Sequence, residues 1–388
     1  MERGNIAAST PSSALARLDG IAQARSVLLH GGVPDHPGLV EPWIARSWKR
    51  CLSMGRRPHE AVAFDALTPG AVRRTRDANL ALTQASHGVL LELGRALADT
   101  RYFAILTNAD GIVINASGPI DHSDRRADLI TRIGVDLSER SVGTTAIGAA
   151  LTELQPVWLH RGEHFFDDTA VYSCAGAPLF GPAGQCVGML DLTGVDVPER
   201  PELIHLVMQS ARSIENAMAL QRPHTILLRV NWPGTILGAD SDGLIGMDDN
   251  GRIVTCNRAA RDLLPHLNRR SESATDWPHA DELFALPFSM LFDAARNGAG
   301  ASELPLWSGL RLQVLASPAG RSAPPRRSQT QTASTRATSP PDQRRLRDIE
   351  TALIREAVDH ARGNVAQAAA QLGVSRATVY RKLRMRTS

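Results

Sequence analysis

The stretch from Leu346 to Arg386 most constrains what this chain can fold into. Apolar residues recur there every three or four positions, which is the period of one face of an amphipathic helix. Asn364 can cap a helix, because its side chain can accept a backbone hydrogen bond, and Gly373 suits the left-handed position that ends one. The spacing therefore predicts short helices separated by a tight turn, the arrangement of a helix-turn-helix.

The helix after Gly373 carries the surface that we expect to read DNA. It would begin at Ser375. Val379 and Leu383 lie four residues apart and would face inward, against the preceding helices. The exposed faces would then hold four polar residues, which are Arg376, Thr378, Arg381 and Lys382.

Charge also separates this end of the chain from the rest. Residues 318–388 contain 14 basic and 5 acidic side chains, a net charge of +9. The whole chain carries +3, so residues 1–317 carry −6. A basic tail on an acidic body predicts that only the tail meets phosphate. The structural alternative is an ordinary solvated basic helix hairpin.

Two runs of residues carry a resemblance to a known family. They are Gly-Asn-Val at residues 363–365 and Val-Ser-Arg-Ala-Thr-Val-Tyr-Arg-Lys-Leu at residues 374–383. Their order and spacing resemble the Fis-type helix-turn-helix that closes many bacterial transcription regulators. The resemblance implies an all-α domain over residues 344–388 that acts as a homodimer on double-stranded DNA. The expected DNA-binding residues are Asn364, Ser375, Arg376, Thr378, Tyr380, Arg381 and Lys382.

The sequence as a whole predicts a multidomain cytoplasmic protein. A length of 388 residues predicts two to four domains. The first 30 residues contain only the short apolar run 27–29, and no later stretch approaches a membrane span, so we expect no membrane partner. The cysteines show neither zinc-like pairing nor a disulfide framework, so we expect reduced thiols, no metal and no cofactor. They are Cys51, Cys174, Cys186 and Cys256.

Lysine usage excludes one class of nucleotide-binding site. Lysine occurs only at Lys49 and Lys382. A Walker A phosphate loop needs a glycine-rich turn that ends in Gly-Lys followed by Ser or Thr. Neither lysine follows a glycine, so the sequence contains no Walker A motif.

The N-terminal part is predicted to be helical. Residues 1–38 are expected to be loosely ordered apart from one short helix, and residues 39–83 to form a helical segment. Ile44, Trp48 and Leu52 lie four apart and predict an amphipathic helix. A further helix is expected to run from residue 70 to residue 99.

Between residues 100 and 220 the pattern changes to short β-like runs separated by turn signals. The runs at 102–107 and 112–116 flank Asn-Ala-Asp-Gly, a good hairpin turn. Later runs cover 154–160, 174–179 and 185–193, and an amphipathic helix follows from Leu203 to Met218. The pattern predicts an α+β fold with an antiparallel sheet and helices on one side.

Several motifs in this region resemble the GAF domain of the acetoin-catabolism-regulator group. They lie at residues 141–151, 163–166 and 172–179, and the Ser-Trp-Lys-Arg-Cys run at 47–51 matches that group's N-terminal motif. The resemblance implies a GAF sensor domain with flanking helices over residues 84–221. Thr145 stands where the group has asparagine, which puts the same effector in doubt.

GAF domains are small-molecule sensors, so the resemblance implies an effector pocket with apolar walls and a few polar groups. Taken singly, Phe165 is more often a core residue, and His164 is more often hydrogen-bonded structure than a ligand contact. The effector itself is unknown. The predicted effector-binding residues are Trp158, His164, Phe165, Tyr172 and Cys174.

A second sensor-like unit is expected over residues 232–316. Asn250-Gly251 is the best short hairpin signal in the chain, and it separates two apolar runs. With Asn257 starting a helix, this segment resembles the opening of a PAS domain, and Leu310–Leu315 predicts a later strand. We expect a degenerate PAS-like domain that dimerises or relays a signal, since no haem or flavin signature is present.

Residues 317–343 are rich in Pro, Ser, Thr, Arg and Gln and predict a flexible linker. In the acetoin-regulator group an AAA+ ATPase usually sits at this place. The sequence therefore predicts a regulator without ATPase activity and without catalytic residues.

The leading hypothesis is an effector-responsive, sequence-specific transcription regulator. A second hypothesis keeps DNA binding without ligand sensing, as a constitutive repressor or a co-regulator of a full-length sigma-N-dependent activator. RNA polymerase or such a related regulator would be a further partner. A third is a GAF thiol redox enzyme that uses Cys174 and Cys186, although no nearby cation or helix terminus is predicted to lower a thiol pKa.

Overall fold

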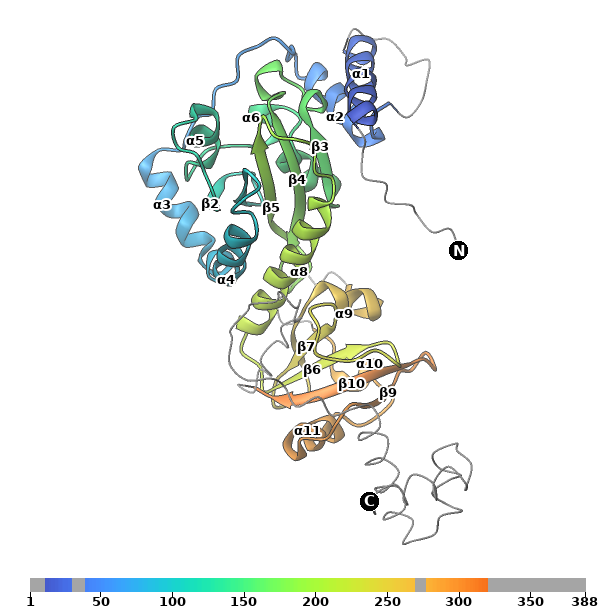
Figure 1. Ribbon diagram of the computed structural model, residues 1–388. Coiled ribbons are helices and arrows are strands. Elements are labelled where there is room, and N and C mark those ends of the chain that lie inside the picture. Colours follow the sequence, from blue (N-terminus) through green and yellow to red (C-terminus); the bar gives the residue numbers. More distant parts are fainter. Residues whose placement is uncertain (1–10, 30–38, 269–276, 320–388) are drawn as a thin grey trace, which may run out of the picture. The chain divides into compact units, whose positions relative to one another are not determined.

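The computed structural model describes residues 11–29, 39–268 and 277–319, except the side chains of residues 11–14. All of these residues belong to one compact unit that spans residues 1–326. Two five-stranded sheets dominate it (Figure 1). We refer to residues 11–221 as the first-sheet region and to residues 226–318 as the second-sheet region.

Four helices precede the first sheet. They are α1 (Pro11–Leu28), α2 (Pro42–Ser53), α3 (Pro69–Ala78) and α4 (Leu80–Ala96). The helix predicted over Ile44, Trp48 and Leu52 is confirmed as α2, whose buried residues include Ile44 and Trp48. The single helix predicted from residue 70 to 99 is wrong. It is two helices, because Asn79 leaves helical geometry (φ −110°, ψ 19°) and its side-chain amide donates to the carbonyl of Thr75 at 2.7 Å, which ends α3.

The first sheet is antiparallel throughout, in the order β2-β1-β5-β4-β3. The predicted hairpin before residue 112 is confirmed: Asn108 Oδ1 accepts hydrogen bonds from the backbone N–H groups of Asp110 and Ile112, at 3.1 and 2.9 Å. The strands are β1 (Tyr102–Asn108), β2 (Val113–Ser117), β3 (Val157–His160), β4 (Tyr172–Phe180) and β5 (Cys186–Val195).

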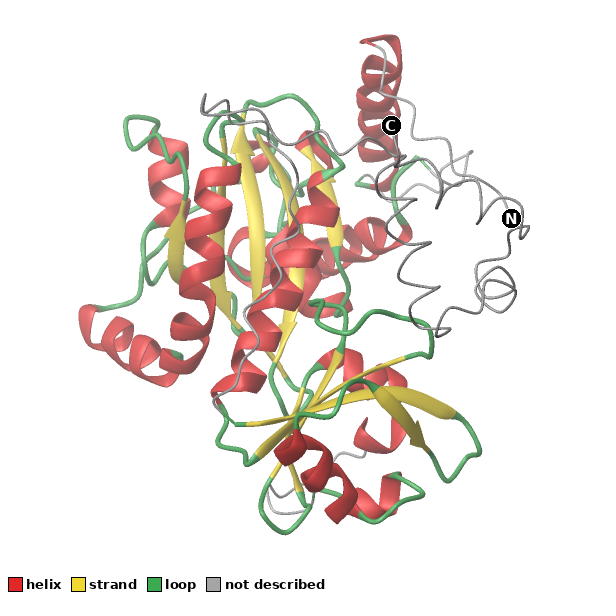
Figure 2. Cartoon of the chain, turned by 60° about the horizontal axis from the view of Figure 1, so that its bottom comes forward, coloured by secondary structure: helices red, strands yellow, loops and turns green. Residues whose placement is uncertain are grey.

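Helices cover both faces of this sheet, so the predicted one-sided arrangement is wrong (Figure 2). Helices α4 and α8 pack with Ala104 and Leu106 of β1 in one core, whereas α2 and α7 share another core with Phe103 and Ile105. The physical reason lies in β1 itself, which is buried at every position and therefore needs cover on both sides. The remaining helices here are α5 (Arg125–Thr131), α6 (Glu139–Val142), α7 (Ala146–Glu153) and α8 (Leu203–Gln221).

The second sheet has the order β8-β7-β6-β10-β9. The hairpin predicted across Asn250-Gly251 is confirmed, with Gly251 at φ +79°, and Asn257 caps α9 by accepting from the N–H of Ala260. The strands are β6 (Ile226–Asn231), β7 (Gly243–Met247), β8 (Ile253–Cys256), β9 (Ser302–Pro305) and β10 (Arg311–Pro318). The helices are α9 (Arg258–Leu263), α10 (Ala280–Leu283) and α11 (Phe288–Asn297).

Strand β6 was not predicted. It lies in the middle of the second sheet, so this sheet begins at Ile226, ahead of the expected domain start at residue 232. Its run Ile-Leu-Leu-Arg-Val is short and follows closely on α8, and Pro223 marks the break between the helix and the strand. The later strand predicted at Leu310–Leu315 is confirmed as β10.

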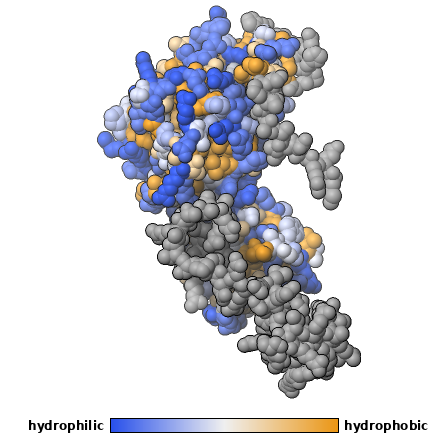
Figure 3. Space-filling model, viewed as in Figure 1, coloured by the Kyte–Doolittle hydropathy of each residue, from blue (hydrophilic) through white to orange (hydrophobic). Residues whose placement is uncertain are grey.

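Apolar and hydrophilic residues are intermixed on the described surface in Figure 3. The second-sheet region exposes a few large apolar side chains, of which Trp307 is 68% and Leu310 55% accessible. Within the described ranges, no helix is both long and apolar enough to cross a membrane.

Candidate functional site

A small buried cavity lies between the first sheet and helix α7. We call it the sheet cavity. Its volume is about 30 Å³, which is room for water or for a few atoms of a ligand. Its walls are mostly apolar, with Ile105, Val142 and Ile147 among them. Its polar lining residues are Thr145, His164, Thr169, Tyr172, Cys174, Asp191 and Thr193.

Strand register places four of these side chains on one face. Successive side chains of a strand point to opposite faces, so residues two apart share a face. Tyr172 and Cys174 therefore lie on the same side of β4, and Asp191 and Thr193 on the same side of β5. Cys174 pairs directly with Thr193 across the two strands, and the next pair on this face is Asp191 with Gly176.

Helix α7 closes the cavity because small residues let it approach the sheet. A Cβ atom added to Gly176 would lie 3.2 Å from the carbonyl oxygen of Ala146 and 2.7 Å from the side chain of Met189. A larger residue there would require Met189 and the start of α7 to shift. Thr145 begins the helix, and its hydroxyl accepts from the N–H of Gly148 at 3.2 Å. The residue that departs from the family pattern is thus a helix cap that also lines the cavity.

Asp191 is the most unusual residue in the lining. Its side chain is 1% exposed, and the Thr193 hydroxyl donates a hydrogen bond to its Oδ2. Oδ1 is buried and has no hydrogen-bond partner among the described residues. Burial raises the pKa of Asp191 to about 7, and the hydrogen bond from Thr193 only partly opposes this rise.

Cys174 and His164 form a neutral pair beside Asp191. The thiol Sγ lies 3.7 Å from His164 Nε2, and His164 Nδ1 lies 2.9 Å from the carbonyl oxygen of Arg161. The carbonyl can only accept, so Nδ1 carries the proton and Nε2 accepts from the thiol. Burial lowers the pKa of His164 to about 4 and raises the pKa of Cys174 well above its usual value. A protonated thiol beside a neutral imidazole is a poor nucleophile, so this geometry gives no support to thiol redox chemistry.

The loop that carries His164 is held from outside by α1 and α2. It contains the short helices η1 (Arg161–Glu163) and η2 (Asp167–Thr169). The guanidinium of Arg25 donates to the carbonyl groups of Gly162 and Phe165, at 3.0 and 3.1 Å. The indole of Trp48 donates to the carbonyl of Glu163 at 2.9 Å. The N-terminal helices therefore fix one wall of the sheet cavity.

The predicted effector-binding residues divide into two groups. His164, Tyr172 and Cys174 line the sheet cavity together. Phe165 is fully buried and packs edge-on against Phe166 in the core, outside the lining. Trp158 packs with the core on the opposite face of the sheet, and its indole donates to Glu199 at 3.2 Å.

Sequence reasoning missed Asp191 and Thr193. A signal was available, because Asp191 stands between Leu190 and Leu192 in a strand whose other residues are apolar or small. An acidic residue at an inward position of a strand buried on both faces is rare enough to indicate a function.

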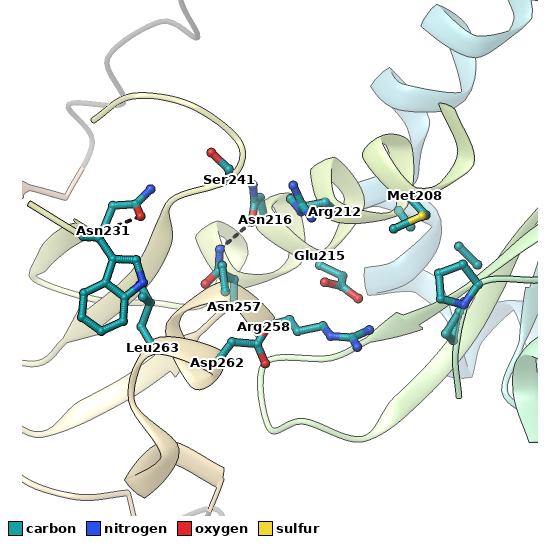
Figure 4. A pocket seen from close by; sticks show the side chains of 16 residues that line it. Met208, Arg212, Glu215, Asn216, Asn231, Ser241, Asn257, Arg258, Asp262 and Leu263 are labelled. Atoms are coloured by element: carbon teal, nitrogen blue, oxygen red, sulfur yellow. Dashed lines mark hydrogen bonds between the residues drawn. The ribbon is translucent and has the colours of Figure 1, made fainter. Parts of the chain in front are cut away.

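A second hollow, the α8–α9 cleft, has a volume of about 400 Å³ (Figure 4). Arg212, Glu215 and Arg258 line it, and Trp232 also belongs to the lining. Glu215 is 5% exposed, and its Oε1 accepts from the N–H of Phe180 at 2.8 Å. Burial raises the pKa of Glu215 to about 7, and the nearby arginines oppose that rise.

In the part of the chain that the structure describes, no group of three or more His, Cys, Asp or Glu side chains could hold a metal ion. The predicted DNA-binding residues lie outside the described ranges. These are Asn364, Ser375, Arg376, Thr378, Tyr380, Arg381 and Lys382.

Two family descriptions match the sequence. "MimR, N-terminal domain" matches residues 20–216, which is just over half of the chain. "Bacterial regulatory protein, Fis family" matches residues 345–385. The second match includes all seven predicted DNA-binding residues.

Several similar curated proteins are transcription regulators. The acetoin catabolism regulatory protein of Cupriavidus necator is 28% identical over 66% of this chain and 38% of its own length. The propane 2-monooxygenase operon transcriptional activator MimR of Mycolicibacterium goodii is 26% identical over 62% of this chain and 40% of its own length. The matched part thus spans well under half of the length of these relatives.

Among solved structures, the crystal structure of the E. coli DhaR(N)–DhaL complex is similar. It has 16% sequence identity and a TM-score of 0.44, and the match covers 72% of this chain and 100% of that chain.

Proposed function

Because the chain belongs to the family defined by the MimR N-terminal domain, we propose that it is a sequence-specific DNA-binding transcription regulator controlled by a small molecule. The observation that carries the proposal is the Fis-family match at residues 345–385, on the same chain as the MimR N-terminal match at residues 20–216. The net charge of +9 over residues 318–388 supports DNA as the partner of this end.

In this proposal the first-sheet region is a GAF-type sensor and the second-sheet region is a PAS-type relay. The fold supports this assignment, because each region contains a five-stranded antiparallel sheet and a hydrophobic core of its own. The effector would occupy the sheet cavity, beside His164, Tyr172 and Cys174. The names of the relatives refer to acetoin and propane, which are small and uncharged, and a small apolar cavity suits such molecules.

The regulator would act as a homodimer in the cytoplasm, where its operator lies. Only residues 319–344 separate the end of β10 from the Fis-family match, and the sequence has no Walker A motif. We therefore propose that the chain does not hydrolyse ATP. Its output would be DNA occupancy, which the effector changes by favouring one dimer arrangement.

The same short interval favours a second candidate function. Without an ATPase of its own, the chain would be a repressor or co-regulator that works with RNA polymerase or with a related, ATPase-bearing activator. Under this candidate, operator binding would be unchanged by any ligand of the sheet cavity.

Gel-shift titration against a genomic fragment library tests DNA recognition. The double variant Arg376→Ala/Arg381→Ala should weaken retention of the selected fragment by roughly tenfold or more, because two contacts to base or phosphate are lost. The matched control is Arg73→Ala/Arg74→Ala on α3, which removes two exposed arginines from the first-sheet region and should leave retention unchanged. Equal retention by both variants would overturn the assignment of the reading helix.

A further inference from the structure

One polar atom in the sheet cavity stands apart from all the others. Every other polar side chain of the lining has a hydrogen-bond partner within the protein, and these side chains are Thr145, His164, Thr169, Tyr172, Cys174 and Thr193. Asp191 Oδ1 alone has none among the described residues. A buried carboxylate oxygen without a donor is costly, so its retention in the interior needs a reason.

The described residues do not supply the missing donor. Asp191 Oδ2 already takes the hydroxyl of Thr193, and the Cys174 thiol lies between His164 Nε2 and that same hydroxyl, at 3.7 and 3.4 Å. A single water could fill the space, but a buried water needs two to four polar partners, and here it would find few that are not already engaged. Such a water is easily displaced by a ligand that brings one donor and an apolar remainder.

The chemistry of the lining narrows the class of ligand. A carboxylate repels an anion, and His164 is neutral, so nothing in the lining would bind a negative group. An ammonium group carries three N–H donors, and the cavity offers one unpartnered acceptor. A hydroxyl carries one donor, which matches that acceptor, and an aliphatic remainder matches walls such as Ile105 and Ile147.

We propose that Asp191 is the residue that selects the effector, and that the effector is a short, uncharged aliphatic molecule whose hydroxyl donates a hydrogen bond to Asp191 Oδ1. The volume of about 30 Å³ limits the molecule to a few heavy atoms and requires part of the lining to move as it enters. This inference rests on the proposed ligand-sensing function, and it adds the ligand class and the determinant of selectivity.

A matched pair of probes tests the proposal on the full chain. The alcohol 2-butanol and the ketone 2-butanone have the same carbon skeleton and differ in whether the oxygen donates a hydrogen bond. At pH 8.5, which favours the ionised form of Asp191, we expect 2-butanol to bind at least about tenfold more tightly by NMR titration, because a hydrogen bond to a charged group is lost with the ketone. A third probe, 2,3-butanediol, should bind at least as tightly as the alcohol.

The variant Asp191→Asn should abolish or reverse this preference. The amide oxygen can take the hydroxyl of Thr193, which leaves an N–H group facing the cavity, and a ketone can accept from it where an alcohol gains less. Glu215→Gln is the matched control: it also neutralises a buried carboxylate whose pKa is raised to about 7, but it lies in the α8–α9 cleft. The control should keep the preference of the unmodified protein.

Three results would overturn the proposal: equal binding of alcohol and ketone, no binding of any probe, or an unchanged preference in Asp191→Asn. The first two need only the unmodified protein, so they decide the question even where the variant does not fold. DNA retention is measured separately by gel shift. Loss of DNA binding with intact probe selectivity would contradict the regulator and leave the role of Asp191 standing, and the reverse result would contradict Asp191 alone.

Discussion

The sheet cavity and the α8–α9 cleft each contain a buried carboxylate, and the two differ in how they are hydrogen-bonded. Asp191 and Glu215 are 1% and 5% exposed, and burial raises the pKa of each to about 7. Glu215 accepts a backbone N–H from Phe180 and borders a cleft of about 400 Å³ with arginines on its walls. Asp191 faces a cavity of about 30 Å³ with one oxygen unpartnered.

A raised pKa therefore does not by itself identify a group that binds a ligand. Both carboxylates are protonated more easily than usual, since burial penalises the charged form of each. Glu215 also has a structural role, because it ties α8 to the end of β4. Among the described residues, Asp191 accepts a side-chain hydrogen bond only from Thr193 of the same strand, and the proposed ligand would supply the partner that its other oxygen lacks.

The largest expected effect is on the free energy of unfolding of Asp191→Asn as the pH rises. The pKa of folded Asp191 is about 7 against an ordinary value of 3.8, so between these values the folded protein keeps a proton that the unfolded chain has released. The free energy of unfolding must therefore fall as pH rises through this window. Asparagine removes this fall, so the variant should gain up to about 4 kcal/mol relative to the unmodified protein between pH 4 and pH 8.

Urea denaturation of both proteins at several pH values between 4 and 8 measures this gain. We expect the stability curves of the unmodified protein and of Asp191→Asn to converge near pH 4 and to separate as the pH approaches 8. Curves that stay parallel over the whole range would show that Asp191 is solvated and would remove the premise that its oxygen lacks a donor.

Glu215→Gln should give the same pH trend with a smaller amplitude. The pKa of Glu215 rises from an ordinary value of 4.5 to about 7, so the unmodified protein again loses stability as pH rises through that interval, by at most about 3 kcal/mol. Glutamine keeps an acceptor for the N–H of Phe180, and the same urea series measures its gain. A gain larger than that of Asp191→Asn would mean that burial raises the pKa of Glu215 more than that of Asp191.

Local sequence signals predicted much of the fold on which these hollows depend. The hairpins at 108–111 and 250–251 were predicted because Asn, Asp and Gly in a short turn act locally, without help from the rest of the chain. The cap of α9 by Asn257 is local in the same sense. The break at Asn79 was missed because the apolar pattern continues across it, although Asn79 ends α3 through a local hydrogen bond to Thr75. Strand β6 was missed because its short apolar run follows closely on α8.

The candidate site was predicted in part, for a related reason. Family motifs pointed to His164, Tyr172 and Cys174, which the fold brings together. They also pointed to Trp158, which packs with the core on the opposite face of the sheet, and to Phe165, which is buried in the same core as Tyr172 and Cys174 but does not line the cavity. Asp191 was missed although its place between two leucines was a signal, and only the packed sheet reveals which of its oxygens lacks a partner.

The smallest expected effect is the difference in unfolding free energy between two helix-cap variants, one in each region. Asn257 caps α9 and also accepts from the N–H of Leu244 at 2.9 Å and donates to Asn216 of α8 at 2.7 Å, all in a buried site. Asn257→Ala should therefore lower the free energy of unfolding by roughly 2 kcal/mol, because it leaves buried groups without partners.

Thr145→Ala is the counterpart at the sheet cavity, where the cap makes one hydrogen bond to Gly148. We expect it to cost about 1 kcal/mol, the usual contribution of a helix cap. Urea denaturation at a single pH measures both variants, since neither residue titrates. Equal losses would mean that the hydrogen bonds of Asn257 beyond its helix cap contribute nothing to stability.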